Sequence, residues 1–257
     1  MTSNPYESSD DTASLNQSIK ETAPKRLTLA EFLVVILILG LLVAFLLPAR
    51  RQASEAARRN GCHNNMRQIA LAIRNYESAT GRFPPAYTVD ENGNRLHSWR
   101  TLILPYLEEQ ALYDTIDLSK PWDHPDNAQA REAIVVPYIC PSGKWADEAM
   151  TTYLAIDGDD CCFNGSTPRL LSEVTDSHDK TLMVIEVAED MAVHWMSPRD
   201  TSTQAIEKMS PESEVSHSGV VIASFVDNHT AALSLEVDIE ELPGAASVAG
   251  GEDVRIR

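Results

Sequence analysis

The longer part of the sequence lacks any cluster of basic residues. Residues 83–257 hold 11 Lys and Arg against 31 Asp and Glu, a net charge of −20. Proteins that bind nucleic acid gain most of their energy by neutralising phosphates with grouped Lys and Arg, and an acidic surface forfeits that energy. We therefore exclude DNA and RNA as partners of this part of the chain.

Signatures of catalysis and of cofactor binding are also missing. The chain has no G-x-S-x-G elbow, Walker loop, H-E-x-x-H helix or dinucleotide-binding glycine pattern. It has no C-x2-C pair, its histidines are scattered, and the acidic run at residues 157–160 lacks the EF-hand pattern. We predict no cofactor, no metal and no enzymatic activity.

Long hydrophobic runs are scarce, and only one is present. Residues 32–47 are all apolar or glycine. A helix over residues 27–49 would be about 34 Å long, enough to cross a hydrocarbon core of about 30 Å. The sequence thus predicts a single-pass transmembrane helix at 27–49 with the lipid membrane as partner. Residues 1–26, which hold few large aliphatic side chains, are a predicted disordered leader.

A basic segment follows, with a net charge of +5 over residues 50–82. Met66, Ile69, Ala70 and Ile73 recur at helical spacing, which predicts an amphipathic stem helix that ends near Gly81. We expect a kink near Pro48 and a possible break at Gly61. The apolar stripe of this stem needs a partner surface, and the acidic part of the chain is the obvious one.

Short apolar runs separated by turns rich in Pro, Gly and Asp follow over residues 83–237. They predict one α+β domain, a mostly antiparallel sheet with the stem helix laid across it. Residues 220–226 and 231–237 read as the two strands of a hairpin with its turn at Asp227 and Asn228. Residues 238–257 are a predicted flexible tail.

Glu31 is a carboxylate at the start of the apolar run, where an unpartnered charge is costly. Thr28 and Glu31 have the spacing of a capping box, in which each side chain binds a free amide at the helix start. Alternatively, Glu31 pairs with a positive group on the helix of a neighbouring subunit.

The segment Arg26-Leu27-Thr28-Leu29-Ala30-Glu31, with the apolar run after it, resembles the N-terminal methylation motif of type IV prepilins and of type II secretion pseudopilins. The resemblance implies cleavage before Leu27, methylation there, and a role for Glu31 in subunit register. Arg26 stands where that motif has glycine, which favours retention of the leader. A pilin-like topology places the acidic domain outside the membrane, whereas the count of positive charges flanking the helix favours the opposite.

Further segments resemble the bacterial domain of unknown function 1559 family, whose members are secreted or membrane-anchored proteins with a pilin-type N-terminus. His217 and Asp227 stand ten residues apart, similar to the H-x9-D-G signature of that family, with Asn228 in place of glycine. The resemblance implies a pilin-like fold and spans residues 26–237. Its other segments are residues 47–49, 55–59, 62–72, 75–86, 98–108, 138–142, 152–155 and 176–186.

The four cysteines, at positions 62, 140, 161 and 162, allow three pairings in a domain expected to face an oxidising compartment. Four free thiols are the alternative. The resemblance favours a disulfide between Cys62 and Cys140, since both lie in segments similar to the family.

The sequence supports three hypotheses for the function. The first is a membrane-anchored, pilin-like protein with a periplasmic or extracellular domain and a structural, assembly or secretion-linked role, with possible homo- or hetero-assembly through its N-terminal helix. The second is an anchored module that binds a solute or glycan through stacking tryptophans. The third, which we disfavour, is a hydrolase that uses His217 and Asp227 with Ser216 or Ser218 as nucleophile. The tryptophans are Trp99, Trp122, Trp145 and Trp195.

Overall fold

The structure, a computed structural model, describes residues 28–145 and 148–251, without the side chains of residues 39–54. The chain divides into two compact units, residues 1–51 and 52–257. The α-helices are α1 (Leu29–Thr80), α2 (Trp99–Leu102), α3 (Gln110–Tyr113), α4 (Ala128–Arg131), α5 (Thr203–Ile206) and α6 (Leu242–Ala246). The strands are β1 (Tyr87–Val89), β2 (Arg95–Ser98), β3 (Met150–Thr151), β4 (Tyr153–Ala155), β5 (Leu182–Glu186), β6 (Val193–His194), β7 (Val220–Phe225) and β8 (Thr230–Ser234).

In the first unit, a capping box starts α1. The amide of Thr28 donates to Glu31 Oε2 at 2.8 Å, and the amide of Glu31 donates to Thr28 Oγ1 at 3.3 Å. Thr28 and Glu31 therefore make the contacts of a capping box. The predicted leader, with Arg26 and Leu27, lies outside the described residues. Among the residues that are described, no helix is both long enough and apolar enough to span a membrane.

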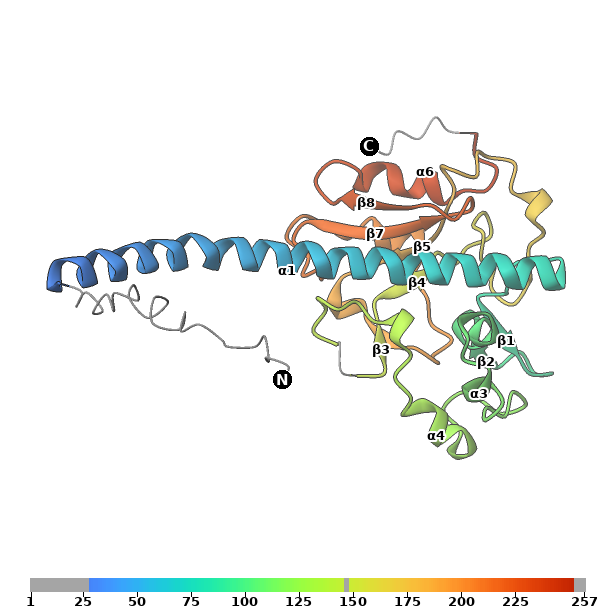
Figure 1. Ribbon diagram of the computed structural model, residues 1–257. Helices are drawn as coiled ribbons and strands as arrows, with labels where there is room; N and C mark the ends of the chain where they lie inside the picture. Colours follow the sequence, from blue (N-terminus) through green and yellow to red (C-terminus); the bar gives the residue numbers. More distant parts are fainter. Residues whose placement is uncertain (1–27, 146–147, 252–257) are drawn as a thin grey trace, which may run out of the picture. The chain divides into compact units, whose positions relative to one another are not determined.

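The second unit is built around an antiparallel sheet in the order β4-β5-β7-β8 (Figure 1). Two antiparallel ribbons, β1-β2 and β3-β6, complete the strand pairing among the described residues. The mixed α+β class with antiparallel sheets is therefore confirmed. Strands β7 and β8 form the expected hairpin, and Asn228 takes the left-handed backbone (φ 73°) that its turn requires.

The two faces of this sheet support two separate cores, because neighbouring residues of a strand point to opposite sides. On β4, Tyr153 and Ala155 pack with α1, whereas Leu154 packs with α5 and α6 on the other face. A register shift in β5 turns both Met183 and Val184 toward the α1 side. The sheet is thus covered by α1 on one face and by the short helices α5 and α6 on the other.

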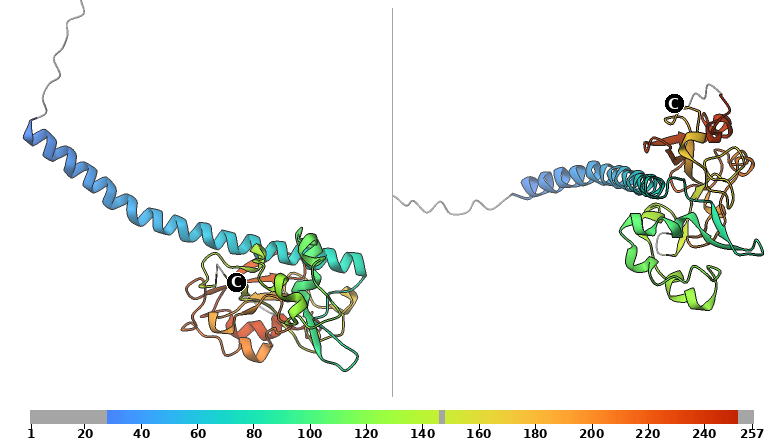
Figure 2. Two further views of the ribbon diagram at one scale, coloured as in Figure 1. Left: turned by 90° about the horizontal axis from the view of Figure 1, so that it is seen from below. Right: turned by 90° about the vertical axis from the view of Figure 1, so that its right-hand side faces the viewer.

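The predicted stripe of α1 is fully buried: Met66, Ile69, Ala70 and Ile73 have no exposed surface. Residues 52–80 of α1 lie between the β7–β8 hairpin and the segment that contains α2 to α4 (Figures 1 and 2). The helix continues without interruption through Pro48 and Gly61, so neither residue ends it. Gly61 serves close packing instead, since a Cβ atom there would come within 3.3 Å of Cγ of Pro141.

A buried ion pair connects α2 to the irregular segment after β6. Arg100 Nη1 lies 2.7 Å from Asp200 Oδ1, and these two side chains are 0% and 2% exposed. The remaining N–H groups of Arg100 donate to the carbonyl oxygens of Tyr153, Trp195, Ser197 and Arg199. The guanidinium therefore has acceptors for all five of its donors.

The described part of the predicted tail, residues 238–251, is packed rather than loose. A 3-10 turn (Ile239–Glu241) leads into α6, and Leu242, Ala245 and Ala246 are buried under the sheet. This difference has a simple cause. The second face of the sheet needs an apolar cover, and the small residues of α6 provide it at close range.

Arg100→Met should lower the free energy of unfolding of the full chain by about 3–5 kcal/mol, because it leaves the buried carboxyl group of Asp200 without its counter-charge. Chemical denaturation followed by circular dichroism measures this. Arg67→Met, which removes an exposed arginine from α1, is the matched control and should change stability by less than about 0.5 kcal/mol. Equal effects of the two substitutions would show that the buried pair contributes nothing.

Candidate functional site

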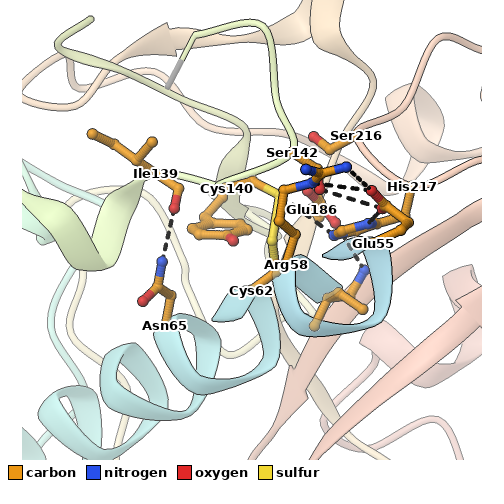
Figure 3. Close-up of a disulfide and its surroundings, with 12 residues drawn as sticks. Glu55, Arg58, Cys62, Asn65, Ile139, Cys140, Ser142, Glu186, Ser216 and His217 are labelled. Atoms are coloured by element: carbon orange, nitrogen blue, oxygen red, sulfur yellow. Dashed lines mark hydrogen bonds and ion pairs between the residues drawn. A yellow bond between two sulfur atoms is a disulfide. The ribbon is translucent and has the colours of Figure 1, made fainter. Parts of the chain in front are cut away.

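Four side chains with metal-binding or redox chemistry meet inside the second unit. They come from distant segments: Cys62 from α1, Cys140 from the loop after a 3-10 turn (Val136–Tyr138), Glu186 from the end of β5, and His217 from the loop before β7 (Figure 3). Their ligand atoms all lie within 4.8 Å of one another, and all four residues are buried. We call these four residues the buried cluster.

Cys62 and Cys140 form a disulfide that closes a separation of 78 residues, with their Cα atoms 5.2 Å apart. The surrounding contacts hold its two ends in place. Asn65, one turn after Cys62, donates through Nδ2 to the carbonyl oxygen of Ile139 at 2.7 Å. The disulfide therefore joins α1 to the loop that carries Cys140.

His217 bridges the disulfide and a carboxylate of α1. Its Nδ1 lies 3.0 Å from Glu55 Oε1, and its Nε2 lies 3.4 Å from Cys140 Sγ. An ionised carboxylate only accepts hydrogen bonds, so Nδ1 carries a proton, and in the neutral form of the ring the lone pair of Nε2 faces the sulfur. Arg58 donates to Glu55 Oε2 at 2.7 Å and, with His217, lowers the pKa of Glu55. Glu55 therefore stays ionised and fixes the orientation of the imidazole.

Glu186 is the least satisfied member of the buried cluster. Its Oε2 accepts from the amide of Ile222 at 3.2 Å, while its Oε1 has no hydrogen-bond partner among the described residues. Burial raises the pKa of Glu186 to about 7. The hydroxyl of Ser216 donates to Glu189 Oε1 at 2.8 Å, and it also lies close enough to Glu186 to oppose part of the rise in the pKa of that carboxyl.

The structure separates His217 from Asp227. Whereas His217 contacts Glu55 and Cys140, Asp227 Oδ1 lies 2.6 Å from Nδ1 of His229 in the hairpin turn. No hydrogen bond or ion pair joins His217 to Asp227 among the described residues. The arrangement that the hydrolase hypothesis needs is therefore not formed. Asp227 and Asn228 shape the turn, as their position between β7 and β8 predicts.

The other two cysteines are free, buried thiols. Burial raises the pKa of Cys161 to about 11 and that of Cys162 to about 12. Since the thiolate is the reactive form, burial lowers the reactivity of both thiols in the folded chain.

Two of the four tryptophans are buried and the other two are partly exposed, so Trp99 and Trp195 offer no stacking surface to a solute or glycan. Trp99 and Trp195 are buried, and their indole N–H groups donate to Asp200 and to the carbonyl oxygen of Ala133. Trp145 donates to the carbonyl oxygen of Glu189, and Trp122 packs against the ring of His194. Each side chain thus has a structural role in or beside the core.

Sequence reasoning missed Glu186 and Glu55. Both stand in segments that resemble the family, but neither spacing nor composition marks them. A usable signal for Glu186 is its position, because a lone carboxylate that ends the apolar strand Leu182–Glu186 needs a buried partner. The sequence predicted no metal site, because motif searches detect ligands that are closely spaced along the chain. The four residues of the buried cluster come from four distant segments, so no such spacing exists.

Comparison with known proteins identifies a family. The model of a family described as a protein of unknown function (DUF1559) matches residues 51–240. No curated protein matches the chain, and no solved structure does so either.

Reduction of the full chain should lower its free energy of unfolding by about 3–5 kcal/mol, because the disulfide closes a long loop in the unfolded chain. Denaturation with and without a phosphine reductant, in the presence of a chelator, measures the change. The Cys62→Ala/Cys140→Ala variant is the control and should not respond to the reductant. Peptide mapping of the oxidised chain should recover Cys62 joined to Cys140; any other pairing would contradict the assignment.

Proposed function

The chain belongs to the family of proteins of unknown function 1559, and on that premise we propose that it is a single-pass, membrane-anchored protein with a structural or assembly role. In this proposal, residues 27–49 cross the membrane, and the acidic domain faces the periplasm or the cell exterior. The domain acts through its surface and its linkage to α1 rather than through catalysis.

The exposed apolar side chains at the start of α1 carry the proposal. Leu29 and every residue from Phe32 to Ile38 are 46–76% exposed, and consecutive positions of a helix cover all of its sides. A helix that is hydrophobic all round is stable only inside a protein core or inside a membrane. The same apolar run continues in the sequence to residue 47, which supports an apolar environment of membrane thickness.

The way α1 is used further along the chain supports a structural role. From Cys62 onward the helix contributes a stripe to the core of the second unit, and the disulfide joins it covalently to the loop that carries Cys140. One helix therefore serves as the proposed anchor and as a core element. An arrangement of this kind suits a domain that is held or assembled through its helix, as in pilins.

The disulfide also supports the proposed compartment. Structural disulfides persist in the periplasm and outside the cell and are rare in the cytosol. This agrees with the topology that the pilin-like segment implies and opposes the plain count of flanking positive charges.

Leu37→Arg combined with Leu42→Arg should release the full chain from carbonate-washed membranes, because each buried arginine costs about 2.5–3.5 kcal/mol of insertion and the favourable contribution of each leucine is lost. The matched control is Leu71→Arg, which changes a leucine of α1 that is 51% exposed in the second unit and should leave the membrane fraction unchanged. A wild-type chain found in the wash would contradict anchoring.

Arg26 predicts that the leader is retained. The intact mass of the membrane-extracted chain should correspond to residues from Met1, and Arg26→Gly should create a substrate for a prepilin peptidase. A wild-type mass that begins at a methylated Leu27 would instead establish pilin-type processing. Crosslinking of the same extract then distinguishes a monomer from an assembly formed through α1.

A further inference from the structure

We infer that the buried cluster is a redox-gated zinc site: when the disulfide is reduced, Cys62, Cys140, Glu186 and His217 bind one Zn²⁺. The inference concerns the second unit alone and holds whether or not residues 27–49 cross a membrane. It assigns a ligand to a cluster whose separate residues each stand in a segment that resembles the family.

The donor set has the chemistry of a zinc site. Two thiolates, an imidazole and a carboxylate are the ligands that Zn²⁺ takes in tetrahedral coordination, and thiolates disfavour the harder Mg²⁺ and Ca²⁺. Three anionic ligands would be costly to bury alone, and the two positive charges of the metal offset most of that cost.

The ligand atoms lie close enough together for one tetrahedral ion. With metal–ligand bonds of about 2.0–2.3 Å, neighbouring ligand atoms in a zinc site are about 3.3–3.8 Å apart. Cys140 Sγ and His217 Nε2 are already 3.4 Å apart, and all four ligand atoms lie within 4.8 Å of one another. Once the S–S bond is cleaved, rotation about the Cα–Cβ bonds of the two cysteines separates the sulfur atoms to the required distance.

Two ligands are prepared for a metal. Nδ1 of His217 binds Glu55, so its Nε2 lone pair points at the sulfurs, and Arg58 holds that carboxylate from its other side. A carboxylate behind an imidazole is the usual outer partner of a metal-binding histidine. Glu186 contributes an oxygen, Oε1, that is buried and has no hydrogen-bond partner among the described residues. A bound cation would give this oxygen the partner that it lacks.

The proposed conversion of the disulfide into the zinc complex takes two steps. A dithiol reductant transfers two electrons and two protons to the disulfide, which yields the thiols of Cys62 and Cys140 and an oxidised reductant. Zn²⁺ then displaces the two thiol protons and binds both sulfurs, Nε2 of His217 and Oε1 of Glu186. In the reverse direction a small disulfide takes two electrons from the zinc-bound thiolates and two protons from water, which re-forms the S–S bond, yields two thiols of the oxidant and releases Zn²⁺. The site thus exists in two exclusive forms, a disulfide or a zinc complex.

Cobalt titration of the full chain in detergent tests the site, since tetrahedral Co²⁺ bound to thiolates gives intense visible and charge-transfer absorption. After reduction by a phosphine without oxygen, the wild type should bind one Co²⁺ per chain, and Zn²⁺ should bleach the spectrum. The oxidised chain should show no such bands. Cys161→Ser/Cys162→Ser should keep the bands, whereas Cys62→Ser/Cys140→Ser should lose them.

Matched variants test the other ligands. Glu55→Gln should weaken Zn²⁺ binding by about 10–100-fold, and His217→Gln or Glu186→Gln by at least as much. Glu77→Gln, which changes a glutamate paired with Arg74 on the same helix, should have no effect. Unchanged affinity in either ligand variant would overturn the four-ligand assignment.

A second readout covers the case in which the reduced chain loses its fold. Zn²⁺ added during refolding under reducing conditions should then restore the circular dichroism of the wild type and of Glu77→Gln, but not of His217→Gln. A reduced wild-type chain that gives no thiolate–cobalt bands and gains no structure from Zn²⁺ would refute the site.

Discussion

The packing of the middle of the domain depends on the ion pair and the hydrogen bonds of one buried group, the guanidinium of Arg100. Between β6 and α5 the backbone is irregular yet passes through the core, where carbonyl oxygens without donors are costly. Arg100 supplies those donors to Trp195, Ser197 and Arg199, and Asp200 neutralises its charge. Asp200 also accepts from the amide of Ala155 at 2.9 Å, so the same pair anchors β4. In a regular strand, neighbouring strands supply the donors for the carbonyl oxygens. An irregular segment inside a core has no such neighbours and needs donors from a side chain such as Arg100.

The disulfide between α1 and the loop that carries Cys140 fixes a second irregular segment to the core. The loop that carries Cys140 is attached to the helix by a covalent bond, and Asn65 binds the carbonyl oxygen of Ile139 beside it. The polar groups around that bond form a chain from Arg58 through Glu55 to His217. Residues from the helix, the loop and the sheet thus converge at one point, which links the packing of α1 to the chemistry of the buried cluster.

Much of the fold could be predicted from local patterns. The buried stripe of α1, the α+β class, and the β7–β8 hairpin with its turn at Asn228 all follow from periodicity and turn chemistry, which act over a few residues. The covering role of α6 could not, because its small residues look like a loose tail until the second face of the sheet is known. The role of Arg100 was equally hidden, since its partner is a hundred residues away.

The candidate site shows the same division. The resemblance to a family singled out Cys62, Cys140 and His217, but it grouped His217 with Asp227, ten residues along the chain. In the structure Asp227 turns a hairpin, and the carboxylates near His217 are Glu55 and Glu186. Those contacts depend on the packing of β5 against α1. The spacing of residues along the sequence does not predict contacts between such distant elements.

The disulfide between Cys62 and Cys140 also determines how the chain would carry a mechanical load. A force that enters through the N-terminal end of α1 and leaves through β7 would pass from Cys62 to Cys140 along the S–S bond. The 78-residue separation that this bond closes would then be bypassed, so the end of α1, the β1–β2 ribbon and α2 to α4 would remain free of tension. A domain held by its helix would in this way keep a third of its chain folded under load.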